Sequence, residues 1–254
     1  EEVVVESKTL SFEDYINCRI MNLLVKIYVD HDHFREILGI IRKYNFSVFK
    51  VLWLLKEQIL PKYPSLVNLI DSYVENSKKP LFDSYEEISK FVSDVDNVKA
   101  YISGKYGQNE LANHRVEAYM DNLDDLYKAL KETVIIYLKN KDVLTNDLEN
   151  YFEEAITISK DRKFNFNNYD NIENVLEKEI SFDFVQADKE GFLIDPSNHK
   201  IKRRKIKLYY DDKQILTIKD MIKRHAIYSN LLHEKGKLYA KGNTRLLNRK
   251  ITYI

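Results

Sequence analysis

The strongest chemical signal in this chain is a concentration of basic residues toward its C-terminus. From residue 199 onward the sequence has sixteen lysines and arginines and four acidic residues, a net charge of +12. Because the whole chain has no net charge, residues 1–198 carry −12. The densest part of this block is our candidate anion-binding site and consists of Lys200, Lys202, Arg203, Arg204, Lys205 and Lys207.

A basic block of this density attracts phosphate groups, nucleic acid or an anionic membrane surface. Tyr209, Tyr210 and Tyr239 are interleaved with the bases, as stacking platforms for nucleotides would be, although the chain contains 18 tyrosines in all. The alternative is that the block docks on the acidic N-terminal part of the chain or on a neighbouring domain. The sequence leaves both interpretations open.

Histidine and aspartate side chains suggest a metal site at one position. His31-Asp32-His33 combines two ligand types that commonly bind metal ions. The triplet falls at a predicted turn between two helices, where Asp32 can cap the second helix, and no second cluster of histidine or cysteine accompanies it. His225 and His233 are eight residues apart and need a third ligand from elsewhere. We therefore predict no metal, catalytic or cofactor-binding residue in this chain.

Motifs for nucleophilic catalysis and phosphate binding do not occur in the sequence. It has no glycine-rich phosphate loop and no GxSxG elbow. The single cysteine, Cys18, excludes a disulfide framework and any cysteine-rich metal site built from this chain alone, which is typical of a reducing compartment. We interpret Cys18 as a small buried residue and predict a cytoplasmic protein. The sequence predicts no self-contained active site.

Helices are expected over most of the chain. Between residues 11 and 160, apolar residues recur at three- and four-residue spacing, which is the period of helices that bury one face. The expected helices cover residues 11–30, 32–41, 47–59, 64–76, 84–102, 109–139, 145–159 and 171–179. Ser11 and Asp14 have the spacing of a capping box at the start of the first helix.

After residue 179 the pattern changes to shorter elements. We expect a strand over 182–187, a strand over 205–210 that turns at 211–213 into a third strand over 214–216, and a helix from 217 to 236. No window approaches the ~20 consecutive apolar residues of a transmembrane helix. The expected fold is mainly α, with residues 1–10 as a linker from a preceding domain, 11–180 as a multi-helix bundle and 181–254 as a small basic α+β subdomain.

Two segments of the chain resemble a known family. The first contains Ser11-Phe12-Glu13-Asp14-Tyr15, Arg19, Leu23-Leu24-Val25, the turn from Asp30 to Phe34, and Phe46-Ser47-Val48-Phe49; the second is Phe182-Asp183-Phe184-Val185-Gln186. Together they are similar to the region that follows the barrel in cobalamin-binding radical S-adenosylmethionine proteins. The two segments cover less than half of the chain.

This resemblance implies a parent protein with an N-terminal cobalamin-binding domain and a central barrel that holds a [4Fe-4S] cluster and S-adenosylmethionine. The chain has none of the CxxxCxxC cluster ligands and none of the alternating strand–helix units of a barrel, so we expect no cofactor in the chain itself. Our leading hypothesis is a non-catalytic C-terminal accessory domain that covers the barrel or selects the substrate or partner, and that contacts the N-terminal domains of its own parent chain. The alternatives are an independent anion- or nucleic-acid-binding helical module and a purely structural interaction domain.

Overall fold

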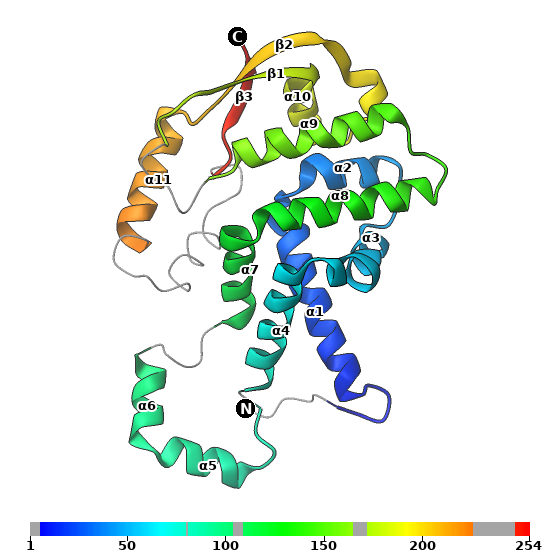
Figure 1. The fold of residues 1–254 in the computed structure, drawn as a ribbon. Helices are drawn as coiled ribbons and strands as arrows, with labels where there is room; N and C mark the ends of the chain where they lie inside the picture. Colours follow the sequence, from blue (N-terminus) through cyan, green and yellow to red (C-terminus); the bar gives the residue numbers. More distant parts are fainter. Residues whose placement is uncertain (1–5, 80, 104–108, 165–171, 226–246) are drawn as a thin grey trace.

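The computed structural model describes residues 6–79, 81–103, 109–164, 172–225 and 247–254. Most of the described residues are helical (Figure 1). The α-helices are α1 (Phe12–Tyr28), α2 (Arg35–Lys43), α3 (Val48–Leu54), α4 (Pro64–Lys78), α5 (Tyr85–Ser93), α6 (Val95–Ile102), α7 (Glu110–Asp121), α8 (Leu123–Lys139), α9 (Asn146–Arg162), α10 (Phe184–Lys189) and α11 (Asp212–His225). The strands β1 (Leu176–Phe182), β2 (Lys200–Tyr209) and β3 (Lys250–Tyr253) form one antiparallel sheet in the order β1-β2-β3. The expected mainly α fold with a small α+β part is confirmed.

Local capping explains where several helices begin. The Ser11 hydroxyl accepts a hydrogen bond from the Asp14 backbone N–H at 3.1 Å, and the Asp14 carboxylate accepts one from the Ser11 N–H at 3.4 Å, which confirms the predicted capping box. Ser47 and Thr145 cap α3 and α9 in the same way with their hydroxyl oxygens. These contacts satisfy backbone donors that have no partner within the helix.

The hydrophobic core contains several aromatic side chains where α1, α2 and α8 meet. Phe34, just before α2, packs on Tyr28 of α1 and Tyr127 of α8, with ring-centroid distances of 4.9 and 4.8 Å. All three side chains are completely buried. Figure 1 shows α2 between α8 and α9, so this cluster lies at the centre of the helical body. Burial of three aromatic side chains contributes strongly to its stability.

Two of the expected helices are each divided in two. The helix expected over 84–102 breaks at Asp94, whose backbone is extended and whose side chain caps α6 by accepting from the Asp96 N–H at 2.9 Å. The helix expected over 109–139 breaks at Asn122, whose φ of −122° and ψ of 11° depart from helical geometry. The continuous helices predicted for these segments are therefore wrong at one residue each.

The turn between α1 and α2 also differs from the prediction. Asp32 was expected to cap the second helix, but it lies in a short 3-10 turn, η1 (Asp30–Asp32), and has a positive φ of 54°. Phe34 holds the N-cap position of α2 and makes no side-chain capping bond. Aspartate tolerates this left-handed conformation because its short polar side chain can bond locally.

The C-terminal part differs from the prediction in three elements. The helix expected over 171–179 is wrong, because residues 176–182 form β1 and pair with β2. The strand expected over 182–187 is helix α10, because Asp183 caps it by accepting from the Gln186 N–H at 2.9 Å. The strand expected over 214–216 belongs to α11, where Asp211 accepts from the Gln214 N–H at 2.8 Å. The expected helical continuation to 236 lies outside the described residues.

The expected strand over 205–210 is confirmed within the longer β2. β1 extends across the expected boundary at residue 180. The sheet lies over α9 (Figure 1). The buried faces of β1 and β2 consist of Ile180, Phe182, Ile206 and Leu208. The helical and C-terminal parts therefore share one continuous core.

Two further observations concern solvent exposure and hydropathy. Cys18 is exposed on α1, so our interpretation of it as a buried residue is wrong. Among the described residues no helix combines the length and the apolar character needed to cross a membrane.

Candidate anion-binding strand

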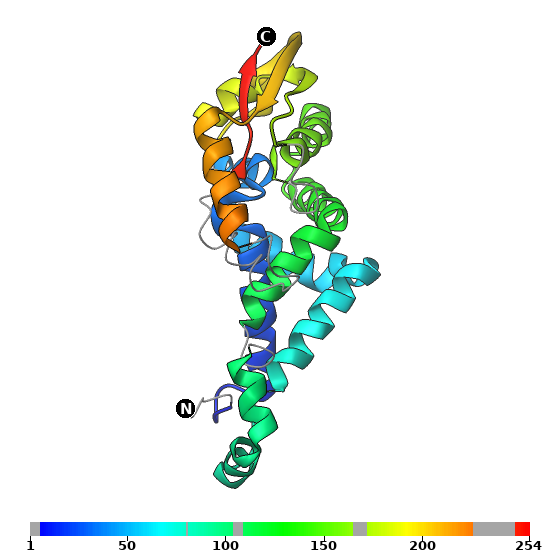
Figure 2. The same ribbon diagram turned by 90° about the vertical axis from the view of Figure 1, so that its left-hand side faces the viewer.

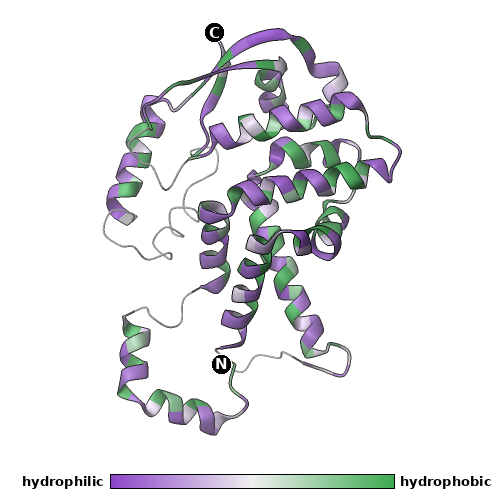
Figure 3. Cartoon of the chain, viewed as in Figure 1, coloured by the Kyte–Doolittle hydropathy of each residue, from purple (hydrophilic) through white to green (hydrophobic). Residues whose placement is uncertain are grey.

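All six basic residues of the candidate site lie on β2. The strand is anchored at its C-terminal half, where Ile206 and Leu208 are buried, whereas every residue from Lys202 to Lys205 is exposed. Figure 3 shows this part of β2 as a hydrophilic stretch at the edge of the molecule. The fold thus presents the bases outward on a strand held in place by its own apolar half.

A bulge in the β1–β2 ladder changes the direction of the side chains at the centre of the site. Ile180 pairs with Arg204 and Phe182 pairs with Lys200, so three residues of β2 lie opposite Ser181 alone. Bulges increase the local twist and re-aim side chains. In this strand the bulge contains Lys202 and Arg203, and both are exposed.

The two ends of the basic run already have acidic neighbours. Lys200 forms an ion pair with Asp147 at the start of α9, with an Nζ–Oδ1 distance of 2.8 Å. Lys207 lies directly opposite Glu177 on β1, and its Nζ is 5.2 Å from the ring centroid of Tyr209. Lys200 is the only one of the six whose ion pair, among the described residues, reaches the acidic helical part. Among the described residues, docking on the acidic helical part therefore involves Lys200, and docking on a neighbouring domain stays a prediction.

The four middle residues form what we call the β2 patch: Lys202, Arg203, Arg204 and Lys205. Within the described parts of the chain, none of the four has a carboxylate within ion-pair distance, although Glu179 lies opposite Lys205 across the ladder. The Arg204 guanidinium stacks over Tyr253 of β3 at 4.0 Å from the ring centroid. The patch therefore carries four solvent-facing positive charges within ~10 Å of extended strand.

An acidic residue beside the patch affects Tyr253. Burial, followed by a hydrogen bond with Asp183, raises the pKa of Tyr253 to about 12, while Arg204 acts in the opposite direction. The tyrosine is therefore protonated at neutral pH and holds Arg204 against the sheet as an uncharged ring. This contact fixes the guanidinium plane, which leaves its outer N–H groups free to bind an anion.

Several other basic and aromatic residues of the tail have partners within the chain. Lys219 pairs with Glu173 at 2.5 Å, and Lys250 pairs with Asp211. Tyr210 is buried and its hydroxyl donates to the Leu247 carbonyl at 3.1 Å, so it is no stacking platform. Tyr239 lies outside the described residues.

Of the histidine candidates, His33 is the one whose side-chain contacts the structure describes. The His33 ring is buried against Tyr119, with 4.4 Å between ring centroids. In the described portion of the chain, no group of three or more histidine, cysteine, aspartate or glutamate side chains is arranged to hold a metal ion. His225 ends α11, and His233 lies outside the described residues.

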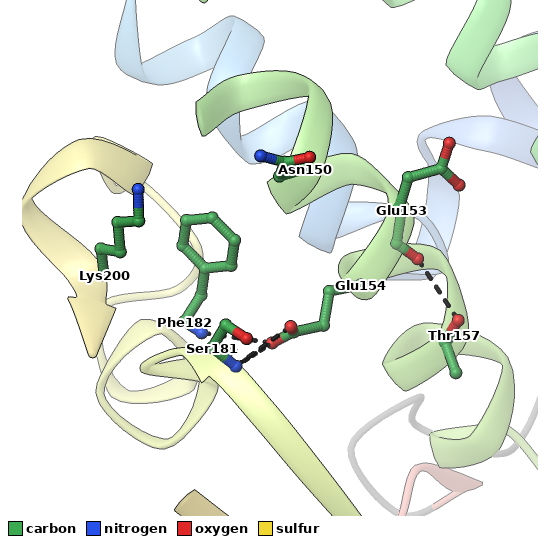
Figure 4. A pocket seen from close by; sticks show the side chains of 7 residues that line it. All are labelled: Asn150, Glu153, Glu154, Thr157, Ser181, Phe182 and Lys200. Atoms are coloured by element: carbon green, nitrogen blue, oxygen red, sulfur yellow. Dashed lines mark hydrogen bonds between the residues drawn. The ribbon is translucent and has the colours of Figure 1, made fainter. Parts of the chain in front are cut away.

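An open groove of about 530 Å³ separates α9 from the β1–β2 end of the sheet (Figure 4). Glu154 points into it from α9 and accepts hydrogen bonds from the backbone N–H groups of Ser181 (2.8 and 3.0 Å) and Phe182 (3.2 Å). Lys200 lies at its rim. Because Glu154 is satisfied by backbone donors at the bulge, its role is to hold the ladder that presents the β2 patch.

A buried ionic cluster, which the sequence reasoning missed, connects the helices to the C-terminal part. Its charged members are Arg35 and Glu36 of α2, Arg162 and Lys163 at the end of α9, and Asp188 of α10. Arg162 lies 2.9 Å from the Asp188 carboxylate and 3.6 Å from that of Glu36, and Arg35 also pairs with Asp188. Glu36 and Arg162 are almost completely buried.

Ser159 is the hub of this cluster. Its hydroxyl donates to the Glu36 carboxylate at 2.9 Å and accepts from the Lys163 ammonium at 2.8 Å. The Tyr127 hydroxyl lies 2.7 Å away and must donate, because the one hydroxyl proton of Ser159 is already used. Burial lowers the pKa of Lys163 to about 8; the nearby Glu36 opposes this shift and Arg162 reinforces it.

The enclosure of Lys163 decides between a chemical and a structural role. A serine, a lysine with a lowered pKa and a tyrosine are groups that nucleophilic catalysis employs. Here Ser159 and Tyr127 are completely buried, and Lys163 lies between the rings of Phe34 and Tyr127 at 5.5 and 5.3 Å. The cluster therefore joins α2, α9 and α10 rather than facing a substrate.

Comparisons with protein-family models, with curated proteins and with solved structures found no match. The resemblance to cobalamin-binding radical S-adenosylmethionine proteins consequently stays a prediction, as do the cofactors and partners that it implies.

Proposed function

We propose that this chain is a binding module that contacts the phosphate backbone of a nucleic acid through the β2 patch. The observation that carries this proposal is the run of four exposed bases without an ion-pair partner in the described structure. Protein–nucleic acid affinity arises largely from such contacts with phosphates. A duplex carries one negative charge per ~1.7 Å of its axis, so ~10 Å of strand faces several phosphates at once.

The shape of the site supports a backbone contact rather than base recognition. The bases project from a strand rather than from the walls of a pocket, and the bulge distributes them over both faces of the β1–β2 ribbon. Contacts of this kind position a nucleic acid but do not read its sequence. We therefore expect similar affinity for single-stranded oligonucleotides of different sequence.

Replacement of the four bases of the β2 patch by serine tests this function. Binding of a fluorescent ~20-nucleotide single strand at low salt should fall at least tenfold. The matched control replaces Lys43, Lys50, Lys139 and Lys141, which are exposed residues on other elements, and changes the net charge by the same amount. Equal loss in both variants would show a nonspecific charge effect, and equal binding by the patch variant and the unaltered chain would contradict the proposal.

We propose as a second candidate an accessory domain of a cobalamin-binding radical S-adenosylmethionine protein. One side chain supports it, because Tyr151 of α9 contacts both the second segment and the residues just after the Asp30–Phe34 turn of the first. Tyr151 donates to the Glu36 carbonyl at 2.9 Å, immediately after the Asp30–Phe34 turn, and stacks on Phe184 of the second segment at 5.4 Å. The N-terminal domains of the parent would then be the partners, and they would hold the cluster, S-adenosylmethionine and cobalamin.

The coding sequence upstream of this chain tests the second candidate. The proposal expects an open frame that continues into a barrel with a CxxxCxxC triplet. An in-frame upstream region that encodes no such triplet would contradict it. This outcome is independent of the binding experiment, because an accessory domain can use the β2 patch as well.

A further inference from the structure

We infer that α5 and α6 form a dimerisation arm through which two copies of this chain associate. We define the arm as Tyr85–Ile102. In Figures 1 and 2 it projects from the helical body beyond the ends of α1 and α4. Neither of its helices contains a buried residue. The inference concerns a surface distinct from the β2 patch and does not depend on the proposed function.

Local contacts define the shape of the arm. Ser84 caps α5 and Asp94 caps α6, so each helix has its own start signal. Phe91 packs on Phe82 at 5.1 Å and meets the Tyr101 ring edge-on at 6.3 Å, which joins the two helices. The arm therefore consists of two short helices that meet at an angle at Asp94 (Figure 1) and are joined by a small aromatic contact.

Each helix of the arm carries one exposed apolar stripe. They consist of Tyr85, Ile88 and Val92 on α5 and of Val95, Val98 and Ile102 on α6. In each helix the spacing is three and then four residues, the a/d spacing by which helices pack side by side in water. All six side chains are exposed, Tyr85 by 79% and Ile102 by 82%. Figure 3 shows these apolar segments on the isolated arm.

Helices of this length need a partner to stay ordered. α5 has nine residues and α6 has eight, whereas isolated helices shorter than ~12–15 residues are marginal in water. Within the described residues the body supplies no such partner, because α5 and α6 pack mainly on each other. Among the described residues, nothing covers the two apolar stripes.

A second copy of the chain fits this requirement in length, spacing and area. Two-fold symmetry places each stripe against an identical one from the second copy. The six exposed apolar residues, at roughly 100 Å² each, offer on the order of 600 Å² per copy, which approaches the ~800 Å² per partner of a standard interface. The arm's projection from the body leaves room for the second copy.

The negative charge of the arm does not favour binding of the phosphate-bearing ligands proposed for the β2 patch. Within Tyr85–Ile102 the acids Glu86, Glu87, Asp94 and Asp96 outnumber Lys90 and Lys99, a net charge of −2. Association of two such arms is driven by apolar burial against a weak charge repulsion. Higher salt should therefore strengthen the dimer by screening this repulsion, whereas it weakens binding to a polyanion.

Sedimentation equilibrium of the 254-residue chain up to about 100 µM tests the inference. We expect the mass to rise with concentration toward twice the 30.2 kDa of one chain, and to rise at lower concentration when salt is increased. Val92→Glu with Val98→Glu should leave a monomer, while Leu216→Glu, an equally disruptive change at an exposed site on α11, should leave the dimer intact. Because no residue of the arm is buried, both variants should fold.

Three results would overturn the inference. One is a monomer at every concentration, and the second is a dimer that survives both glutamate substitutions. The third comes from amide hydrogen exchange: protection of α5 and α6 that does not increase with protein concentration would show that the arm is ordered without a second copy. Loss of the dimer together with retained oligonucleotide binding would refute neither proposal, because the two surfaces are separate.

Discussion

The buried Lys163 makes the stability of this protein depend on pH in an unusual direction. Its pKa is lowered from 10.5 to about 8 in the folded chain, chiefly by burial. Between these two values the unfolded chain binds more protons than the folded one, so the free energy of unfolding rises with pH. Below pH ~8 the buried lysine lowers the free energy of unfolding by its full amount, about 3 kcal/mol, and by pH ~10.5 this destabilisation has disappeared.

The measurable part of this range lies between pH 7 and pH 9. Lys163 alone should raise the free energy of unfolding by about 1.4 kcal/mol over this interval. Above it, buried tyrosines such as Tyr28 and Tyr151, whose pKa values burial raises, act in the opposite direction, because only the unfolded chain ionises them near pH 10. The comparison should therefore stop at pH 9.

Urea denaturation of the unaltered chain and of Lys163→Met at pH 7, 8 and 9 measures the effect. The difference between the two free energies of unfolding should change by about 1.4 kcal/mol across the series, because other titrating groups cancel. Lys139→Met, at the exposed end of α8, is the control and should follow the unaltered chain at every pH. Parallel curves for the unaltered chain and Lys163→Met would refute the reasoning.

Two further substitutions test the contacts that join the helices to the C-terminal part, both by urea denaturation at pH 7. Gly39→Ala should lower the free energy of unfolding by at least about 3 kcal/mol, because the new Cβ would lie 2.1 Å from the Phe192 carbonyl oxygen. Gly191→Ala, which has open space around it but a φ of +65°, should lower it by about 1 kcal/mol. Equal effects would contradict the close approach of α2 to Phe192. Glu36→Gln should cost about 3 kcal/mol, because the buried Lys163 would lose its nearby carboxylate and Arg162 would keep only Asp188; an unchanged stability would show that Glu36 makes no such ionic contacts.

Helix starts were predictable from sequence because capping is local. Ser11 and Asp14 bond to each other's backbone within one turn, and Ser47 and Thr145 act on residues three positions ahead. Such signals need no tertiary context. The breaks at Asp94 and Asn122 were missed because the apolar pattern continues on both sides of a single non-helical residue.

The error at β1 has a different cause. Residues 171–179 contain helix-forming glutamate and lysine, yet 176–182 pair with β2 on both sides of the bulge at Ser181. Glu177 and Glu179 lie opposite Lys207 and Lys205, so these acids serve as cross-strand partners rather than as a solvated helix face. Pairing with a segment some 30 positions later overrides a local preference.

The candidate site divides into a predictable and an unpredictable part. The basic run at 200–207 is contiguous, so composition alone identifies it. The bulge that contains Lys202 and Arg203 and the position of Lys207 opposite Glu177 follow from the register of β1, and the ion pair of Lys200 follows from Asp147 on α9. The ionic cluster around Ser159 joins residues from four separated segments of the chain, and only the folded structure brings them together.

The salt dependence of oligonucleotide binding tests the central claim most directly. Four phosphate contacts to a single strand predict a slope of about −3 in a plot of log affinity against log salt concentration, or roughly a 50-fold loss of affinity between 50 and 200 mM. Replacement of the β2 patch by serine should reduce the slope to near zero, while the control substitutions on other elements should leave it unchanged. A slope that is the same with and without the four bases would contradict the assignment of the anion-binding site to β2.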